Sequence, residues 1–360
     1  MNKKLWIIIG ITVIIIIVLV VVFSGKKPEK VTEKLEVAVI IPLTGPSSSE
    51  GEDLLNGLLL AKEKINADII LHIEDSQGKA TEGITAAKRL LDTKDIDVIV
   101  SFQSSVAIPL LTLAEQYDKP LIVTAVTQDE FAQKSKNAFR LFSPAREYAA
   151  IAAEFANNIG FENVSTLTIH DEYGESTKEY FKKNFKGNIM HEENFEVSER
   201  DFRTILMKIS DSEAVYSVGY NIHWVSLFEQ RKELGRDIVF ISNQNMVSKF
   251  VQSRVGDLLT NAYAAVPPST LVNNKTKNFI EEYTKKYGHK PDWVAPFGYD
   301  IILVLDAVQK NGKRPVDAFY EIEVDGLNGL ISFDESGESY IPLVMVQAKN
   351  GIIEVIKYEE

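Results

Sequence analysis

The sequence contains no cysteine, and this absence excludes several chemistries at once. Without a thiol there is no disulfide, no thiolate metal site, no cysteine nucleophile and no cysteine to carry a lipid. Histidine is scarce, and its 5 residues are scattered at spacings unlike those of metal-binding motifs. We find no G-x-S-x-G turn, no P-loop and no G-x-G-x-x-G after an expected strand. We therefore expect a protein with neither a cofactor nor a catalytic centre.

Positive charge is in deficit once the N-terminal segment is set aside. Residues 1–34 hold six lysines and two glutamates, so the 39 basic and 51 acidic residues of the chain fall to 33 and 49, a net charge of −16 for residues 35–360. Such an acidic surface repels the phosphates of nucleic acids, and we expect no nucleic-acid partner. Solubility at a cell surface accounts for most of this charge.

One long apolar run stands at the N-terminus. Residues 5–23 carry no charge and a single hydroxyl. At ~1.5 Å per residue, a helix of this length nearly spans the ~30 Å hydrocarbon core of a bilayer. We expect residues 1–25 to form an uncleaved transmembrane anchor and residues 26–34 to form a short charged linker. Cleavage as a signal sequence, at the small residues that follow the run, is the alternative.

From residue 35 onwards, short Val/Ile/Leu runs alternate with amphipathic stretches. The first series has expected strands at 35–41, 69–74, 96–102 and 121–126, separated by helical patterns. A second series begins near residue 144 and ends in a strand-like tail after residue 329. Near-continuous apolar strands alternating with helices predict an α/β fold with two doubly wound parallel-sheet lobes.

Polar residues follow two neighbouring strands of the first series. Gln103 ends one strand and Ser104 opens a helix, where free N–H groups and the helix dipole attract an anion. The simpler interpretation is that Ser104 only caps the helix. After the next strand, Thr127 and Glu130 have the spacing of a capping box. Two adjacent strand ends with hydroxyls and open N–H groups favour a ligand site at this edge of the sheet.

The run IIPLTGPSSSEGEDLLNG (40–57) resembles the opening of the branched-chain amino-acid binding proteins, the type I periplasmic (solute-)binding proteins of ABC importers. Other segments resemble the same family in the same order. They are IEDSQGKATEGITAAKRLLDTKDIDVIV (73–100), SSVAIPLLTLAEQYDKPLIVTAVT (104–127), HDEYGES (170–176), VGYNIHWVSLFEQRKELG (218–235), EEYTKKYGHKPD (281–292), FGYDIILVLDA (297–307) and NGLISFDESGE (328–338). The likeness therefore extends over essentially the whole chain from residue 35.

The resemblance implies two lobes, joined by three hinge crossovers, that close on a ligand. Lobe 1 would comprise residues 35–143 plus 268–328, and lobe 2 residues 144–267 plus 329–360.

It also implies which residues bind the ligand. Ser104, the Ala125 backbone and Thr127 would hold the carboxylate and amino group of the ligand. Tyr173 and Tyr220 would close over it from lobe 2, since aromatic faces suit apolar groups and ammonium groups alike. Taken alone, either tyrosine would be interpreted as half-buried packing.

Two positions depart from the family pattern. The carboxylate that neutralises the ammonium group of an amino acid aligns with Gln244, which accepts a hydrogen bond but carries no charge. An aromatic residue of the first loop aligns with Glu50, which either meets a cationic group in the cleft or favours the start of the following helix. Both departures weigh against an aliphatic amino acid as the ligand.

We therefore expect a solute-binding protein held at the cell membrane by a single-pass anchor, with its binding domain outside the cytoplasm. It would capture an amino acid or a related small polar solute and present it to an ABC permease, whose ATPase is encoded elsewhere. A sensory receptor domain of the same fold is the first alternative. A hydrolase that uses His170 beside two acidic residues is the least favoured alternative.

Overall fold

The computed structural model describes residues 34–349 and 351–356, and the described residues from 35 onwards form one compact unit. The predicted transmembrane segment lies outside the described residues. Within the described part of the chain, no helix combines the length and the apolar character needed to cross a bilayer. The anchor therefore stays a prediction.

The first lobe, called lobe 1 below, is built on a five-stranded parallel sheet in the order β2-β1-β3-β4-β5. Its strands are β1 (Leu35–Ile41), β2 (Ile69–Asp75), β3 (Val98–Phe102), β4 (Leu121–Thr124) and β5 (Ala138–Arg140). The apolar runs of the sequence become the buried centre of this sheet because helices cover both of its faces.

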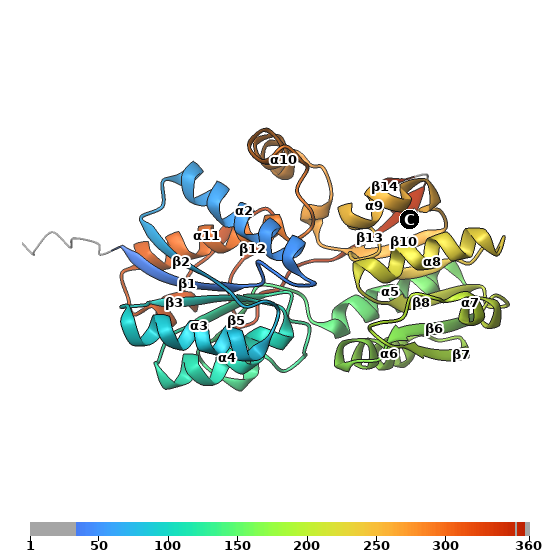
Figure 1. Ribbon diagram of the computed structural model, residues 1–360, viewed down its shortest axis with the longest axis horizontal. Helices are drawn as coiled ribbons and strands as arrows, with labels where there is room; N and C mark the ends of the chain where they lie inside the picture. The colour runs from blue at the N-terminus through green and yellow to red at the C-terminus, as the bar shows by residue number, and fades with distance from the viewer. Residues whose placement is uncertain (1–33, 350, 357–360) are drawn as a thin grey trace, which may run out of the picture. The chain divides into compact units, whose positions relative to one another are not determined.

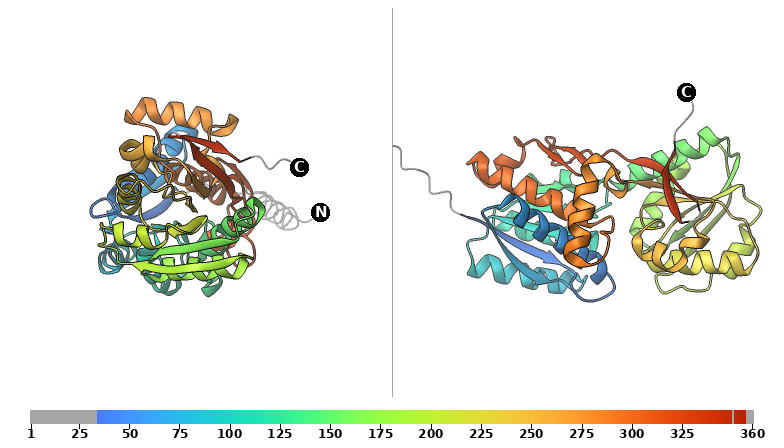
Figure 2. Two further views of the ribbon diagram at one scale, coloured as in Figure 1. Left: turned by 90° about the vertical axis from the view of Figure 1, so that its right-hand side faces the viewer. Right: turned by 90° about the horizontal axis from the view of Figure 1, so that it is seen from above.

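Two helices cover each face of the lobe 1 sheet (Figure 1). One pair is α2 (Ser48–Ile65) with α11 (Ala295–Asn311), and the other is α3 (Ala80–Thr93) with α4 (Ser104–Gln116). Lobe 1 also holds α10 (Asn274–Tyr287), α12 (Pro315–Phe319), β11 (Val324–Gly326) and β12 (Gly329–Ile331). Helix α10 packs on the outer side of α2, where Lys64 pairs with Glu282 at 2.7 Å (Figures 1 and 2).

The second lobe, called lobe 2 below, has a seven-stranded sheet in the order β14-β13-β10-β9-β8-β6-β7. Its strands are β6 (Asn163–Ile169), β7 (Asn188–Phe195), β8 (Ala214–Val218), β9 (Phe240–Asn243), β10 (Ala262–Val266), β13 (Val344–Lys349) and β14 (Ile352–Val355). Its helices are α5 (Ala145–Ile159) and α6 (Glu172–Asn184) on one face and α7 (Arg203–Lys208), α8 (Asn221–Glu233) and α9 (Lys249–Val255) on the other. The predicted α/β fold with two parallel-sheet lobes is confirmed, and β13 and β14 add an antiparallel edge.

The chain crosses between the lobes after β5, after β10 and after β12. The last of these crossings comes later than the sequence suggested. Strand β12 pairs with β11, and the Arg140 N–H donates to the Gly337 carbonyl at 2.9 Å. A Cβ atom on Gly337 would lie 2.0 Å from the Ala138 carbonyl oxygen, so only glycine permits this approach. Residues 329–339, expected in lobe 2, therefore lie against the lobe 1 sheet, and the other lobe boundaries stay predictions.

Candidate ligand-binding site

Two residues with unusual backbone conformations follow adjacent strands of lobe 1. Gln103 after β3 has φ 59° and Ala125 after β4 has φ 56°, a region that side chains other than glycine rarely adopt. The Gln103 N–H donates to the Thr124 carbonyl at 3.1 Å, which ties the two strand ends together. Such strained backbone is concentrated at functional sites, so these strand ends are candidates for one.

The simple capping interpretations of the sequence are wrong at both strand ends. Helix α4 begins with Ser104 as its first residue, and Gln103 occupies the capping position without a side-chain hydrogen bond to the helix backbone. No helix starts at Thr127, because the chain instead turns into the short helix Ala132–Lys134, whose capping residue is Phe131. The hydroxyls of Ser104 and Thr127 are thus not used as helix caps.

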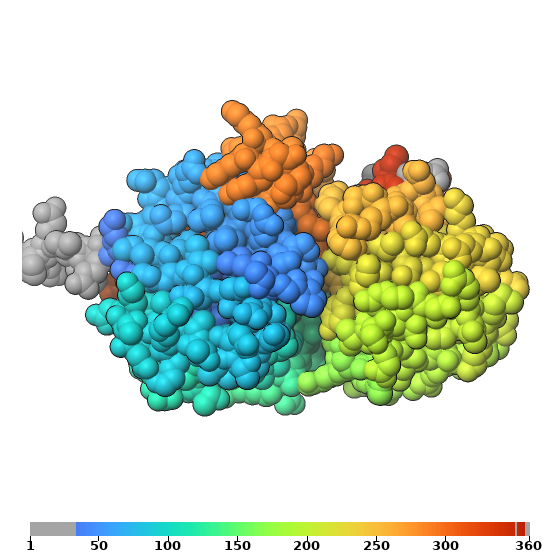
Figure 3. Space-filling view, in the orientation of Figure 1, coloured from blue at the N-terminus to red at the C-terminus, as the bar shows by residue number. Residues whose placement is uncertain are grey.

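Between the lobes lies a cavity of about 290 Å³, called the inter-lobe cavity below. Lobe 1 contributes Ser104, Thr127, Gln128, Asp129 and Glu130. Lobe 2 contributes Glu172, Tyr173, Ser176 and Tyr180, all from α6. Figure 3 shows that the surface is also hollowed along the boundary between the two lobes. The predicted residues Ser104, Thr127 and Tyr173 therefore meet at one cavity, although they come from different lobes.

Tyr173 is fixed in the wall of this cavity from lobe 2. Its hydroxyl contacts the Asn243 amide at the end of β9, and burial raises the pKa of Tyr173 well above its usual value. The Tyr173 hydroxyl consequently stays neutral and can donate to a ligand at any physiological pH.

Tyr220 lies beside the cavity rather than in its wall. Its hydroxyl donates to Asp171 at 2.9 Å, and the other carboxylate oxygen of Asp171 caps α6 at the Gly174 N–H. Burial and the charge of Asp171 raise the pKa of Tyr220. Tyr220 therefore supports the helix that carries Tyr173.

Glu50 makes a direct contact between the lobes. Its carboxylate accepts a hydrogen bond of 2.9 Å from the Asn221 side-chain amide, and Asn221 is only 8% exposed. Because a carboxylate can only accept here, the Asn221 oxygen must point elsewhere, and it has no partner among the described residues. Burial raises the pKa of Glu50. Glu50 also lies in the first turn of α2, so both interpretations of it hold in part.

Gln244 follows β9 and is 4% exposed. Its side-chain oxygen is buried and lacks a hydrogen-bond partner within the described part of the chain. A buried polar atom left without a partner costs about 1–3 kcal/mol, so this oxygen calls for a donor. Gln244 is not in the cavity wall, but its neighbour Asn243 contacts Tyr173.

A buried arginine holds the loop that supplies most of the lobe 1 wall. Arg140, fully buried at the end of β5, donates to the carbonyls of residues 126, 128 and 129, at 3.2 Å for Val126 and 3.0 Å for Asp129. The same guanidinium forms a two-pronged ion pair with Glu338, and its Nε–Oε2 distance is 2.7 Å. No sequence pattern indicated this network.

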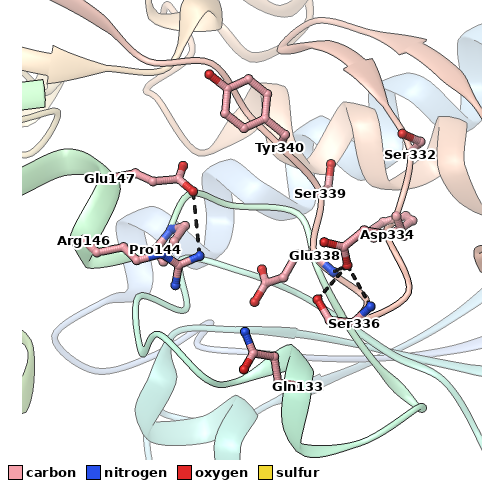
Figure 4. A pocket seen from close by; sticks show the side chains of 11 residues that line it. Gln133, Pro144, Arg146, Glu147, Ser332, Asp334, Ser336, Glu338, Ser339 and Tyr340 are labelled. Atoms are coloured by element: carbon pink, nitrogen blue, oxygen red, sulfur yellow. Dashed lines mark hydrogen bonds and ion pairs between the residues drawn. The ribbon is translucent and has the colours of Figure 1, made fainter. Parts of the chain in front are cut away.

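A second cavity of about 320 Å³ lies where α5 begins and the 332–340 segment passes (Figure 4). Arg146 lines this second cavity and lies 3.2 Å from the carboxylate of Asp129, a residue of the inter-lobe cavity, and 3.9 Å from that of Glu147. Burial raises the pKa of Glu147, and the charge of Arg146 opposes this shift. The two cavities thus share one cation at the first crossover between the lobes.

Comparison with known proteins identifies the family. The family model for periplasmic binding proteins matches residues 34–351. The leucine-, isoleucine-, valine-, threonine- and alanine-binding protein of Pseudomonas aeruginosa is 21% identical over 326 residues, which are 85% of this chain and 87% of that protein. The Leu/Ile/Val-binding protein homolog 3 of Brucella melitensis is 24% identical over 227 residues. That match spans 59% of this chain and 61% of the relative, less than two thirds of its length.

A solved structure shows the same fold. The branched-chain amino acid transporter substrate binding protein LivJ from Streptococcus pneumoniae, in complex with isoleucine, has a TM-score of 0.83 and 21% identity, with 90% of this chain and 100% of that chain covered. The chain therefore belongs to the periplasmic binding protein family and has the two-lobed type I fold.

Proposed function

We propose that the protein captures an amino acid or a related small polar solute in the inter-lobe cavity and presents it to an ABC permease. One observation carries this proposal: hydroxyls at two strained strand ends of lobe 1 face Tyr173 of lobe 2 across a single cavity. Ser104, Thr127 and the Ala125 backbone bind the polar end of the solute. The protein acts by binding alone and is not an enzyme.

The mechanism is closure of the two lobes on the solute. Polar contacts already join the lobes at the cavity, since Gln128 donates to Glu172 at 2.8 Å and Asn221 donates to Glu50 at 2.9 Å. A solute that touches both walls stabilises the closed arrangement, in which these contacts form, over the open one. The permease then distinguishes the two arrangements.

We further propose that residues 5–23 anchor the protein in the membrane and leave the two lobes outside the cytoplasm. The motivating observation is the uncharged length of this run, which matches the bilayer core. Alkaline carbonate extraction of cell membranes tests it. Full-length chain that remains in the pellet supports an anchor, and chain released into the supernatant contradicts one.

Thermal unfolding of the purified full chain tests the binding function. The panel would hold neutral and charged amino acids, small carboxylates and polyamines. A solute at about 100 times its dissociation constant adds about 2.7 kcal/mol to the free energy of unfolding, which raises the melting temperature visibly. If none of these solutes raises it, the proposed function loses its support.

Variants then test the site. The double change Ser104→Ala with Thr127→Val removes both lobe 1 hydroxyls from the cavity and should abolish the thermal shift. Thr112→Val is the matched control, since Thr112 is exposed on the same helix, α4. Equal shifts in the double variant and the control would show that the solute binds elsewhere.

A further inference from the structure

The inter-lobe cavity is lined by carboxylates, and no cationic side chain lies in its described wall. Asp129, Glu130 and Glu172 are acidic, and the wall contains no lysine, arginine or histidine among the described residues. The polar neighbours in the wall, Ser104 and Thr127 included, are neutral. A solute that enters this space therefore meets net negative charge from both lobes.

One of the three carboxylates is paired with a cation that lies outside the cavity wall. Asp129 is 3.2 Å from the Arg146 guanidinium, which lies outside the cavity wall. Glu172 instead accepts from the uncharged amide of Gln128, and Lys134 directs its ammonium to that same amide at 3.1 Å. Glu130 is exposed and forms no ion pair in the part of the chain that the structure describes. Glu130 and Glu172 thus keep their negative charges available.

The remaining wall also suits a cation. Tyr173 and Tyr180 also line it, and aromatic side chains can attract ammonium and guanidinium groups. An anionic solute would add further negative charge to this wall.

We infer that the solute carries a net positive charge, and that its unbalanced ammonium or guanidinium group is held between Glu130 and Glu172. This inference rests on the proposed function, because it concerns the solute class of the same cavity. A volume of about 290 Å³ suits a molecule of amino-acid or diamine size. Electrostatic repulsion by the wall discriminates against small carboxylates.

The decisive experiment is calorimetric titration of the full chain with solute pairs that differ in charge and little in shape. The pairs are lysine with norleucine and arginine with citrulline, accompanied by putrescine, leucine and benzoate. We expect the charged member of a pair, or putrescine, to bind at least about tenfold tighter than any neutral solute. Putrescine binding alone would show that no carboxylate on the solute is needed.

The outcomes separate this inference from the function on which it rests. Equal or tighter binding of leucine, norleucine or citrulline overturns the cation inference and leaves the proposed function intact. Tight binding of benzoate does the same. If none of the named solutes binds, both fail.

Isosteric variants locate the charge. Glu130→Gln and Glu172→Gln should each weaken binding of the cationic solute about fivefold, the size expected for one partly solvated ion pair, and leave its neutral analogue unaffected. Glu229→Gln is the control, because Glu229 is exposed on α8 outside the cavity wall. Unfolding curves of all three variants check that the fold is intact. If both cavity variants bind the cation as tightly as the control does, the assignment is overturned.

Discussion

Replacing the buried Arg140 by methionine should lower the free energy of unfolding by about 3–5 kcal/mol. The guanidinium is fully buried and pairs with Glu338, whose side chain keeps 14% exposure. Removing the arginine leaves this carboxylate with no partner in a poorly hydrated position, and it leaves three loop carbonyls without their donors. Methionine fills much of the vacated space, so lost packing contributes little to the effect.

The surroundings of Arg140 and Glu338 place the loss of unfolding free energy near the middle of this range. Partial hydration of Glu338 reduces the cost of the unpaired charge, whereas hydrogen bonds from a charged donor contribute about 1.5–3 kcal/mol each and are lost together. These effects do not add, because the freed carbonyls at 126, 128 and 129 can move towards water. A value near 4 kcal/mol corresponds to a melting temperature lower by roughly 8 °C.

Urea unfolding of Arg140→Met beside Arg203→Met measures the effect. Arg203 also binds carboxylates, with Glu233 at 2.6 Å, but 46% of its side chain is exposed. An exposed pair of this kind contributes about 0–1 kcal/mol. If both variants lose the same free energy of unfolding, burial is not what makes the Arg140 network strong. Hydrogen exchange gives a second readout, since the amides of residues 126–130 should exchange faster only in Arg140→Met.

Two further predictions concern stability. Burial raises the pKa of Asp53 to about 7, with its hydrogen bond from Tyr283 opposing the shift, so the folded state binds a proton that the unfolded state releases above about pH 4. Lowering the pH from 7.5 to 5.5 should therefore raise the urea midpoint more in the native protein than in Asp53→Asn, and parallel profiles would contradict this. Gly57→Ala places a Cβ atom 2.0 Å from the Ala295 carbonyl oxygen and should cost about 1–3 kcal/mol in thermal unfolding. Gly256→Ala, with no atom within 4 Å of the new Cβ, should cost far less, and equal costs would count against close helix packing.

The sequence predicted the fold and part of the site because both left local signals. Uninterrupted Val/Ile/Leu runs indicated strands covered on both faces, and hydroxyls placed directly after two of these strands drew attention to Ser104 and Thr127. The acidic part of the wall was missed because Thr127 and Glu130 had the spacing of a helix start. The chain turns there instead, and the turn brings Asp129 and Glu130 to the cavity.

Contacts between distant parts of the chain left no such signal. Glu338 lies 198 positions from Arg140, and neither residue stands in a pattern that would single it out. The family resemblance singled out Tyr173 on α6, but Tyr180 on the same helix could be assigned to the cavity only from the structure. For Glu50, sequence reasoning left a choice between cleft and helix start, and its partner from the other lobe, Asn221, is 171 positions away.

The distribution of charge links the choice of solute to the closure of the lobes. In the structure, Glu130 of lobe 1 and Glu172 of lobe 2 line one cavity, and Glu50 is buried against Asn221 with the charge of Asp292 close by. We take this as the closed arrangement of the proposed mechanism. Without a solute, the closed arrangement therefore concentrates negative charge, which opposes closure. A cation in the cavity removes this repulsion, whereas a neutral solute of the same shape leaves it in place. A solute shifts the population towards the closed arrangement only as far as it binds that arrangement more tightly than the open one. A cationic solute should therefore close the lobes more completely than its neutral analogue, even when both are bound to saturation.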